Sequence, residues 1–548
     1  MAPTDEKIKS VDNFFTSSKQ TSFTAICFIS KTFKQNLRNK HHQLTEVGRK
    51  SEGFSPHLDP LVDTKTPCES SGLGAVRHQR RSTQRTDVFS LKAMAPRPNA
   101  GPGGWLCLLL PLAFVVRLLH ATPACKEQAR MQWLLTVAAG GMAIETLCFF
   151  IYAFVKTGIL VKCLVSLLPG VATSLSFYLL VDTSLTFAIV VGFVMTSAYQ
   201  QIYIYTLRGF QRCFTYGEAS VFVQGLVLFA LSAIHRLGGF FCGGSWPSDE
   251  FETLDMIMVN ALFCLLLFCV ALVLFPSLRK PIRFYMWTVL LLLAVTCMPV
   301  TRPLPLLALV QFLLRDGERL TILAFYMLLV VLTCLTVTWQ IGSSAKANTR
   351  VRKIFHLLIV MVYIPGLIFE CALLYLATGV ALAAFVVLEL LRLLKIPPFA
   401  DRLAVAFSTF KDEKDAGELA LTPFCLLIGC SMPIWMTPCP CSGDNTLALL
   451  SGILAVGVGD TAASVVGSKL GRNKWGRSSR SLEGTIAFVV SILIAVWLLE
   501  TTGLVAMSQA KWFATIFAAL NSALVEAFTD QVDNLVLPLI FYTIVGLA

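Results

Sequence analysis

One segment of the chain combines residue types that suit a polyphosphate and its metal ion. Residues 457–484 read GVGDTAASVVGSKLGRNKWGRSSRSLEG, and Asp460 lies near the end of an apolar run. A carboxylate in that position is costly unless it is paired or binds a metal, which favours a functional role. Glu483 lies at the other end, and two separated acids suit Mg²⁺, which prefers one or two carboxylates plus phosphate oxygens. The basic residues, whose side chains suit phosphate groups, are Lys469, Arg472, Lys474, Arg477 and Arg480.

The same segment carries a stripe of small residues. Gly457 and Gly459 flank the approach to Asp460, and glycine lets the backbone approach a ligand closely. Small residues at three- and four-residue steps also form a face for close helix contact, and both roles can hold at once. The further members of the stripe are Ala463, Ser464, Gly467 and Gly471.

Trp475, in the middle of this segment, has two possible roles. Trp475 is either a stacking partner for a base or, as we favour, an anchor at the membrane surface. The segment contains neither a Walker A motif nor the protein-kinase motifs. Its chemistry therefore does not follow from the common nucleotide-binding patterns.

Composition places this segment in a membrane protein. The chain has 548 residues, of which 55% are hydrophobic and 14% are charged, whereas soluble chains carry roughly 25% charged residues. This excludes a soluble globular enzyme, a disordered protein and a disulfide scaffold. Apolar stretches follow one another from residue 104, which predicts an all-α polytopic integral membrane protein with about 14–16 transmembrane helices.

The chain divides by composition into three regions. Residues 1–93 are polar, and we expect them to be a disordered extension upstream of an alternative start at Met94. Residues 94–342 form a multi-span region of unclear role, and residues 343–548 form the membrane-embedded catalytic region. Three charges in the multi-span region suit a substrate path or, equally, ion pairs and interfacial positions; they are Glu145, Asp182 and Arg236.

The polar loops of the last region are expected to share one face of the membrane. Residues 343–353 are rich in Lys and Arg, which predicts a cytosolic position. Pairs of spans then return residues 397–415, 468–483 and 526–533 to the same face. The stretch 510–525 is short for a full crossing, and a re-entrant segment is the alternative. The acidic run within 397–415, Asp412–Asp415, is interpreted as a solvated loop.

The net charge of +12 does not indicate nucleic-acid binding. The basic residues are scattered and are not interleaved with aromatic residues. No protein partner can be inferred from the sequence. The partners expected at this stage are the bilayer and a lipid that reaches the polar face from it.

Motifs spread over residues 350–548 resemble one family. The pattern GD-x-x-A-x-x-x-G-x-x-x-G-x-x-x-W, followed by a basic residue and EG, resembles the CTP-binding signature of the polyprenol kinase family, with the dolichol kinases as its nearest members. Where that family often has Lys shortly before EG, this chain has Arg480, which keeps the charge but not the point geometry. The other family-matched positions are Arg352, Lys353, His356, Glu389, Arg392, Glu526, Asp533 and Asn534.

The resemblance implies a function and a set of site residues. It implies transfer of the γ-phosphoryl group of CTP, with Mg²⁺ or another divalent cation, to dolichol or polyprenol at the endoplasmic reticulum membrane. This would supply dolichyl phosphate for protein glycosylation. The metal ligands implied are Asp460 with Glu483 or Asp533, and the catalytic set is Asp460, Glu483, Asp533 and His356. The CTP-binding set is Gly457, Gly459, Asp460, Thr461, Gly467, Ser468, Lys469, Gly471, Arg472, Lys474, Trp475, Arg477, Arg480 and Gly484.

Two other functions were weighed against this one. A lipid cytidylyltransferase would use the same nucleotide but transfer CMP, and product analysis distinguishes the two. A transporter would also have many spans and intramembrane charges. Transporters usually carry paired internal repeats, and we find no repeat of fixed period in this chain.

Overall fold

The computed structural model describes residues 94–119, 126–343, 349–412, 414–437, 446–476 and 480–548. Apart from residues 270–276, these belong to one compact unit. The predicted extension, residues 1–93, and Arg477 lie outside the described residues. Over the described ranges the chain is helical and has no strand; a single antiparallel bridge joins Lys474 and Ser481.

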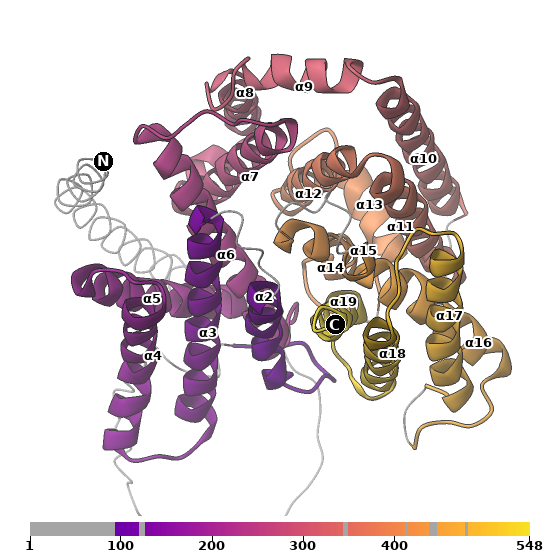
Figure 1. Ribbon diagram of the computed structural model, residues 1–548, viewed down its shortest axis with the longest axis horizontal. Coiled ribbons are helices and arrows are strands. Elements are labelled where there is room, and N and C mark those ends of the chain that lie inside the picture. The colour runs from indigo at the N-terminus through magenta and orange to yellow at the C-terminus, as the bar shows by residue number, and fades with distance from the viewer. Residues whose placement is uncertain (1–93, 120–125, 344–348, 413, 438–445, 477–479) are drawn as a thin grey trace, which may run out of the picture. The chain divides into compact units, whose positions relative to one another are not determined.

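The helices follow one another with short connections (Figure 1). They are η2 Gly104–Leu108, α2 Leu109–Leu119, α3 Lys126–Phe154, α4 Ile159–Leu180, α5 Leu185–Gly209, α6 Tyr216–Phe241, α7 Glu250–Leu274, η3 Pro276–Arg279, α8 Pro281–Cys297, α9 Pro305–Leu314, α10 Gly317–Gly342, α11 Thr349–Phe369, α12 Cys371–Leu393, α13 Ala400–Phe410, α14 Leu421–Met436, α15 Thr446–Leu449, η5 Ile453–Asp460, α16 Thr461–Leu470, α17 Leu482–Thr501, α18 Gln509–Phe528 and α19 Asp533–Val545.

Within the described ranges, ten helices are long and apolar enough to cross a membrane. One is α10, with 26 residues and a mean hydropathy of 2.5. Five shorter apolar helices of 10–17 residues accompany them; the shortest, α9, reaches about 15 Å against a hydrocarbon core of about 30 Å. The prediction of an all-α polytopic membrane protein is confirmed. The predicted 14–16 spans are reached only when the shorter helices are counted.

Helix α19 joins two clusters of buried apolar residues. One cluster draws on α2, α3, α5 and α6, and α19 contributes Leu535 and Leu539 to it. The other draws on α11, η5, α17 and α18, and α19 contributes Leu537 and Phe541. A helix that is apolar on all sides is buried on all sides. The N-terminus of α19, Asp533, is therefore held by contacts from both parts of the chain.

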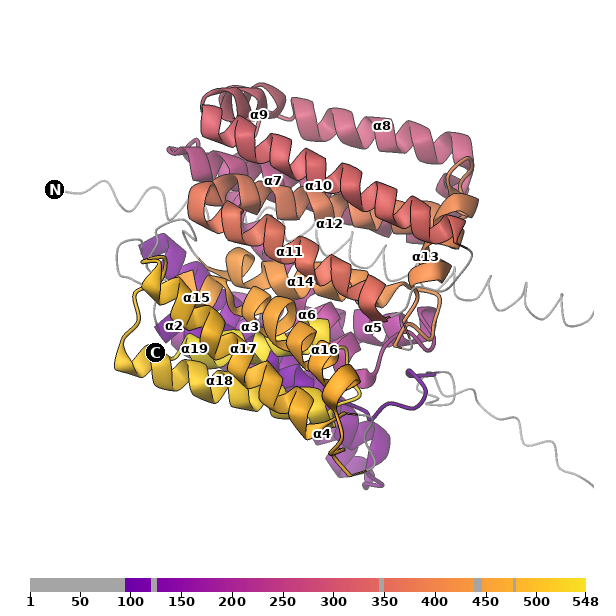
Figure 2. The ribbon, with the colours of Figure 1, turned by 90° about the vertical axis from the view of Figure 1, so that its right-hand side faces the viewer.

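The helices α10, α11 and α12 form a group beside η5. Helix α11 packs against both α10 and α12, and Figure 2 shows the three helices beside one another. Helix α11 also packs against η5, and η5 packs against α17. Helix α13, in the predicted loop 397–415, was not anticipated from the sequence.

The chain around Asp460 does not form one regular span. The expected span 446–467 is divided into α15, the π-helix η5 and α16. A π-helix is rare and often marks a functional position. A Cβ atom on Gly457 would lie 2.6 Å from Val360 of α11, and one on Gly459 would lie 2.8 Å from Phe488 of α17. These two glycines therefore let both neighbouring helices approach η5 closely.

Candidate active site

Asp460 is bound by two residues of α11. The Nζ of Lys353 lies 2.5 Å from Oδ2 of Asp460, and Nε2 of His356 lies 3.3 Å from the same oxygen. Lys353 and His356 are three residues apart, so both project from one face of α11. The Asp460 side chain is 8% exposed, and a buried carboxylate requires such partners. The Nδ1 of His356 forms no hydrogen bond within the described part of the chain.

A second group of charges, here named the polar cluster, comprises Lys414, Arg480, Glu526 and Asp533. The Nζ of Lys414 lies 2.6 Å from Oδ2 of Asp533. The guanidinium of Arg480 contacts that oxygen at 3.4 Å and Oε1 of Glu526 at 3.1 Å. Asp533 lies in the first turn of α19, where the helix dipole favours a negative charge. Its other oxygen, Oδ1, is buried without a hydrogen-bond partner among the described residues.

The guanidinium of Arg480 interacts electrostatically with carboxylates from four separate segments. Burial lowers the pKa of its guanidinium, but the carboxylates of Glu526, Asp533, Asp460 and Asp412 outweigh burial, and the net pKa is raised. The first three of these acids belong to α18, α19 and η5, and Asp412 follows α13. The structure therefore gathers the four polar loops that the order of spans placed on one face.

Residues 411–415 supply contacts that the sequence analysis missed. Lys414 belongs to the polar cluster, Asp412 forms an ion pair with Arg352, and Asp415 is buried and accepts a hydrogen bond from the Thr422 amide at 2.9 Å. For Asp412, Lys414 and Asp415 the interpretation as a solvated loop is therefore wrong, because these side chains contact partners from α11, α14 and α19. Glu413 lies outside the described residues. The order of spans placed this loop on the same face as the other polar loops, and this was the sequence signal that could have predicted these contacts.

Glu389 and Arg392 form a clamp beside the site. Arg392 donates to both carboxylate oxygens of Glu389, at 2.8 and 2.6 Å. Glu389 also accepts from the Ala420 amide at 3.2 Å, and Arg392 donates to the Glu418 carbonyl. This family-matched pair contacts the loop that follows Lys414 and holds it in place.

The loop before α17 is closed by its own hydrogen bonds. The Trp475 amide donates to the Arg480 carbonyl at 3.1 Å, and Trp475 Nε1 donates to Thr485 Oγ1 at 2.9 Å. The Trp475 ring contacts Phe528 with ring centroids 5.1 Å apart. The Glu483 carboxylate accepts from the amide of Asn473 and from its Nδ2, each at 3.0 Å. The side chains of Trp475 and Glu483 are thus engaged within the protein.

The glycines of the motif lie where α16 and α17 touch. A Cβ on Gly467 would lie 3.1 Å from Ser481 Oγ, and one on Gly471 would lie 2.3 Å from the Gly467 carbonyl. A Cβ on Gly484 would lie 3.0 Å from the Ala463 carbonyl. These contacts fit the helix-packing interpretation of the small-residue stripe. Nucleotide contact by the same residues stays a prediction.

The remaining predicted nucleotide-binding residues lie at the surface or along their helices. Lys469, Arg472 and Lys474 are exposed. Thr461 Oγ1 donates to the Val456 carbonyl at 3.3 Å, and Ser468 Oγ donates to the Val465 carbonyl at 3.0 Å. Lys469 and Arg472 are therefore exposed to a soluble anion, and the two hydroxyl groups donate to backbone carbonyls of η5 and α16. The predicted Asn534 is buried, with its carbonyl against Gly429 of α14.

The acids differ in how well they fit Mg²⁺. Among the described residues no contact joins Asp460 to Glu483, because Glu483 is engaged by Asn473 and Asp460 by α11. No group of three metal-binding side chains occurs in the described ranges either. Asp533 and Glu526 share Arg480 as a partner, and Asp533 has an unbonded oxygen. One or two carboxylates are enough for Mg²⁺ when phosphate oxygens complete its shell, so this pair fits better.

A wholly apolar cavity of about 260 Å³ lies beside η5. It is formed by α11, the π-helix η5, α17 and the segments that adjoin them, and Val458, two residues before Asp460, lines it. Residues from the three helices that line it include Ile364, Ile453, Ala495 and Leu498. The helices that hold His356 and Asp460 thus also enclose an apolar space.

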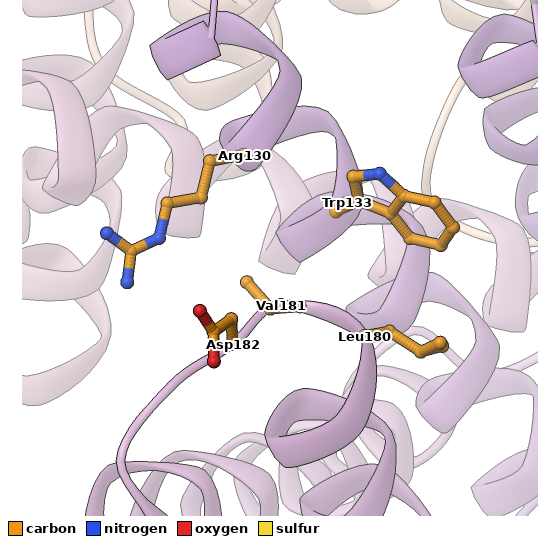
Figure 3. Close-up of a pocket in the computed structure, with 5 residues that line it drawn as sticks. All are labelled: Arg130, Trp133, Leu180, Val181 and Asp182. Carbon is orange, nitrogen blue, oxygen red and sulfur yellow. The ribbon is translucent and has the colours of Figure 1, made fainter.

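The charges singled out in residues 94–342 lie elsewhere. Arg236 forms an ion pair with Asp255, and Glu145 is buried. Asp182 lines a cavity of about 340 Å³ together with Arg130 and Trp133, where its carboxylate and the Arg130 side chain extend into the same space (Figure 3). No predicted site residue lines that cavity. For Arg236 the ion-pair interpretation is confirmed.

Comparison with known proteins identifies relatives of the chain. A family model described as dolichol kinase matches residues 109–425. Dolichol kinase of Homo sapiens is 36% identical over 348 residues, which cover 60% of this chain and 64% of that protein. Dolichol kinase EVAN of Arabidopsis thaliana is 34% identical over 251 residues, which cover 44% of this chain and 43% of that protein.

A fungal relative is more distant. Dolichol kinase sec59 of Schizosaccharomyces pombe is 29% identical over 194 residues, which cover 35% of this chain and 38% of that protein. The matched part of the chain spans less than two thirds of the length of each of these relatives. No solved structure matches the chain. Because the family model matches more than half of its length, the chain belongs to the dolichol kinase family.

Proposed function

We propose that this chain transfers the γ-phosphoryl group of CTP to the terminal hydroxyl of dolichol or a related polyprenol. The observation that carries the proposal is the gathering of Lys353, Asp460, Arg480 and Asp533 at the ends of membrane helices. Several matched relatives are named dolichol kinase. An enzyme that joins a soluble nucleotide to a membrane lipid requires such a polar site beside an apolar bundle.

The phosphate side of the reaction falls to the cations. In phosphoryl transfer the protein mainly positions the reactants and neutralises charge. Lys353, Lys414 and Arg480 each pair with a carboxylate, and phosphate oxygens of the nucleotide would compete for these donors. Mg²⁺ would then be held by Asp533 and Glu526, and it would supply further neutralisation of the transferred group. Exposed Lys469 and Arg472 would attract the nucleotide from solution.

The alcohol side falls to α11 and η5. The apolar cavity between α11, η5 and α17 would hold isoprene units of the lipid, whose hydroxyl would reach Asp460 at the end of η5. We assign His356 as the proton acceptor, oriented by Asp460, because its Nδ1 has no other partner among the described residues. The hydroxyl oxygen forms the bond to the γ-phosphorus, the bond from that phosphorus to the β–γ bridging oxygen breaks, and CDP leaves.

The cellular setting rests on the family resemblance. We place the enzyme in the endoplasmic reticulum membrane with its catalytic loops in the cytosol, where CTP is available. The Lys- and Arg-rich loop 343–353 supports that orientation. Dolichyl phosphate made there would serve protein glycosylation.

The test uses the full chain in detergent with polyprenol, Mg²⁺ and γ-labelled nucleotide. We expect label on the lipid from CTP, not from ATP, and its loss in Asp460→Asn. Asp182→Asn, an acid beside the remote cavity of Figure 3, is the matched control and keeps activity. Lipid labelled only from α-labelled CTP would replace the kinase with a cytidylyltransferase. No label from any nucleotide, in folded protein, would refute both.

A further inference from the structure

A buried ion pair lies on the N-terminal side of the polar cluster. Arg97 NH2 lies 2.7 Å from Glu218 Oε1, with the two side chains 3% and 1% exposed. Arg97 precedes η2, and Glu218 lies in the first turn of α6, where it forms a capping box with Thr215. Neither residue matches a motif, and both lie in the region whose role the sequence left open.

The pair contacts two of the four segments that carry the polar cluster, the one with Lys414 and the one that leads to Asp533. Arg97 donates to the carbonyl of Asp530 at 2.7 Å and to the carbonyl of Lys414 at 3.3 Å. Glu218 accepts from the amide of Val532 at 2.7 Å. One buried pair therefore fixes the backbone at Lys414 and the backbone just before Asp533.

A second set of contacts holds the same loop between α18 and α19. Thr215 Oγ1 donates to Gln531 Oε1 at 2.6 Å, and Gln531 Nε2 donates to the Gly101 carbonyl at 3.0 Å. Lys414 Nζ donates to the Gln531 carbonyl at 2.8 Å, in addition to its ion pair with Asp533. Gly101, Thr215 and Glu218 thus contact the loop that leads to Asp533 of the polar cluster.

Stability alone is a poor explanation for this pair. Replacing a buried ion pair by apolar residues of similar volume is often neutral or stabilising, so such a pair is weak support for a purely structural role. Its contacts are to backbone atoms beside charged side chains of the site, which is what positioning of those side chains requires. The pair fixes where Lys414 and Asp533 sit relative to Arg480.

We propose that Arg97 and Glu218 are positioning residues for phosphoryl transfer. They place Lys414 for the nucleotide phosphates and Asp533 for Mg²⁺, and they make the N-terminal helices part of the catalytic framework. This inference rests on the function proposed above. Neither residue touches the substrates.

The expected effect is large because the pair acts on two site residues at once. Arg97→Met leaves Glu218 buried without its cation and releases both carbonyl contacts. We expect kcat/KM to fall roughly 100-fold, the loss typical of a misplacement of about 1 Å. Arg97→Lys keeps the charge but not the planar fork that reaches several acceptors, so we expect partial recovery. Glu218→Gln is a second variant, should Arg97→Met fail to fold.

The matched control is Arg319→Met. Arg319 also forms ion pairs, with Glu250 at 2.7 Å and Glu370 at 3.1 Å, and its side chain is 12% exposed. Glu250, Glu370 and the Phe312 carbonyl, which Arg319 contacts, lie outside the polar cluster. We expect this variant to lower the melting temperature without changing the KM for CTP or the exchange of the site loops.

The first readout needs no enzymatic activity. Hydrogen exchange of residues 411–420 and 529–533 is compared in wild type, Arg97→Met and Arg319→Met. Faster exchange of both segments in Arg97→Met alone supports the proposal. Unchanged exchange of these segments overturns it, even if the chain is an active kinase. An inactive wild type with faster exchange in Arg97→Met would refute the kinase function and leave the positioning contacts standing.

The second readout is a double-mutant cycle on kcat/KM. If Arg97 acts through Asp533 as well as Lys414, then Arg97→Met combined with Asp533→Asn loses less than the product of the two single losses. Arg319→Met combined with Asp533→Asn should show additive effects. Additive losses for the Arg97 cycle would assign Arg97 to stability and overturn the positioning role.

Discussion

The segment 457–475 is rich in motif residues but poor in ion pairs, whereas the four residues of the polar cluster are joined by several ion pairs. The segment is dense in motif residues, yet apart from Asp460 its glycines lie between helices and its cations are exposed. The cluster draws single residues from four segments, and they meet in partly buried ion pairs. A motif thus marks where a family is recognisable, whereas long-range pairing marks where charge is concentrated. The predictions below test whether chemistry follows the second.

The largest effect is expected from Arg480→Met compared with Arg472→Met. Arg480 contacts both Glu526 and Asp533, and its loss removes the cation that we propose for the nucleotide phosphates. We expect kcat/KM to fall roughly 1,000-fold, with partial recovery in Arg480→Lys. Exposed Arg472→Met should cost less than about 5-fold, as for a surface charge. Steady-state kinetics measures both losses. Equal losses for the two variants would show that the exposed cations of segment 457–475 contribute to catalysis as much as Arg480 does.

The next effect concerns metal dependence. We expect chelation of divalent cations to abolish activity in the wild type. Asp533→Asn should raise the Mg²⁺ concentration for half-maximal activity by roughly 10- to 100-fold. Glu483→Gln should leave it near the wild-type value, because that carboxylate is occupied by Asn473. A Mg²⁺ titration of both variants checks this, and the reverse order would restore the pair Asp460 and Glu483 as ligands.

A smaller effect is expected at the apolar cavity. Ala495→Phe fills part of the space beside η5. We expect the KM for polyprenol to rise about 10-fold, since the lipid loses apolar contact, with an unchanged KM for CTP. Ile494→Phe is the control, because Ile494 is 52% exposed and absent from the cavity lining. A change in the KM for CTP alone would contradict the assignment of the cavity to the lipid.

The smallest effect is expected at Trp475. Trp475→Phe loses the hydrogen bond to Thr485 but keeps the ring contact with Phe528. We expect a loss of about 1 kcal/mol in stability, typical of one hydrogen bond, and an unchanged preference for CTP over ATP. Competition kinetics with both nucleotides provides the test. A lost preference would show that this ring stacks on the base.

Much of the fold was available from the sequence. Apolar run lengths predict membrane helices because the bilayer fixes their length. The order of spans predicted that loops 343–353, 397–415, 468–483 and 526–533 share a face, and their charges meet in the structure. Both inferences need only hydrophobicity and parity, which are local properties.

The rest depends on contacts between distant segments. Arg97 meets the Lys414 carbonyl across 317 residues of sequence, and no periodicity in one chain encodes such a meeting. The π-helix at Ile453–Asp460 lies where Val360 and Phe488 pack closely against Gly457 and Gly459, and this packing is a tertiary contact. Glu483 was predicted to be a metal ligand because two separated acids suit Mg²⁺. The hydrogen bonds to Asn473 gave it another partner.

The central place of α19 has a consequence for biosynthesis. Every helix that contributes to the two apolar clusters beside it precedes it in the chain. Until the ribosome has delivered α19 to the membrane, both clusters lack their shared wall, and Lys414 and Arg480 lack Asp533. Earlier helices can be inserted one by one, but the site closes in a single late step. Ion pairing across the polar cluster would therefore be completed only after α19 has entered the membrane.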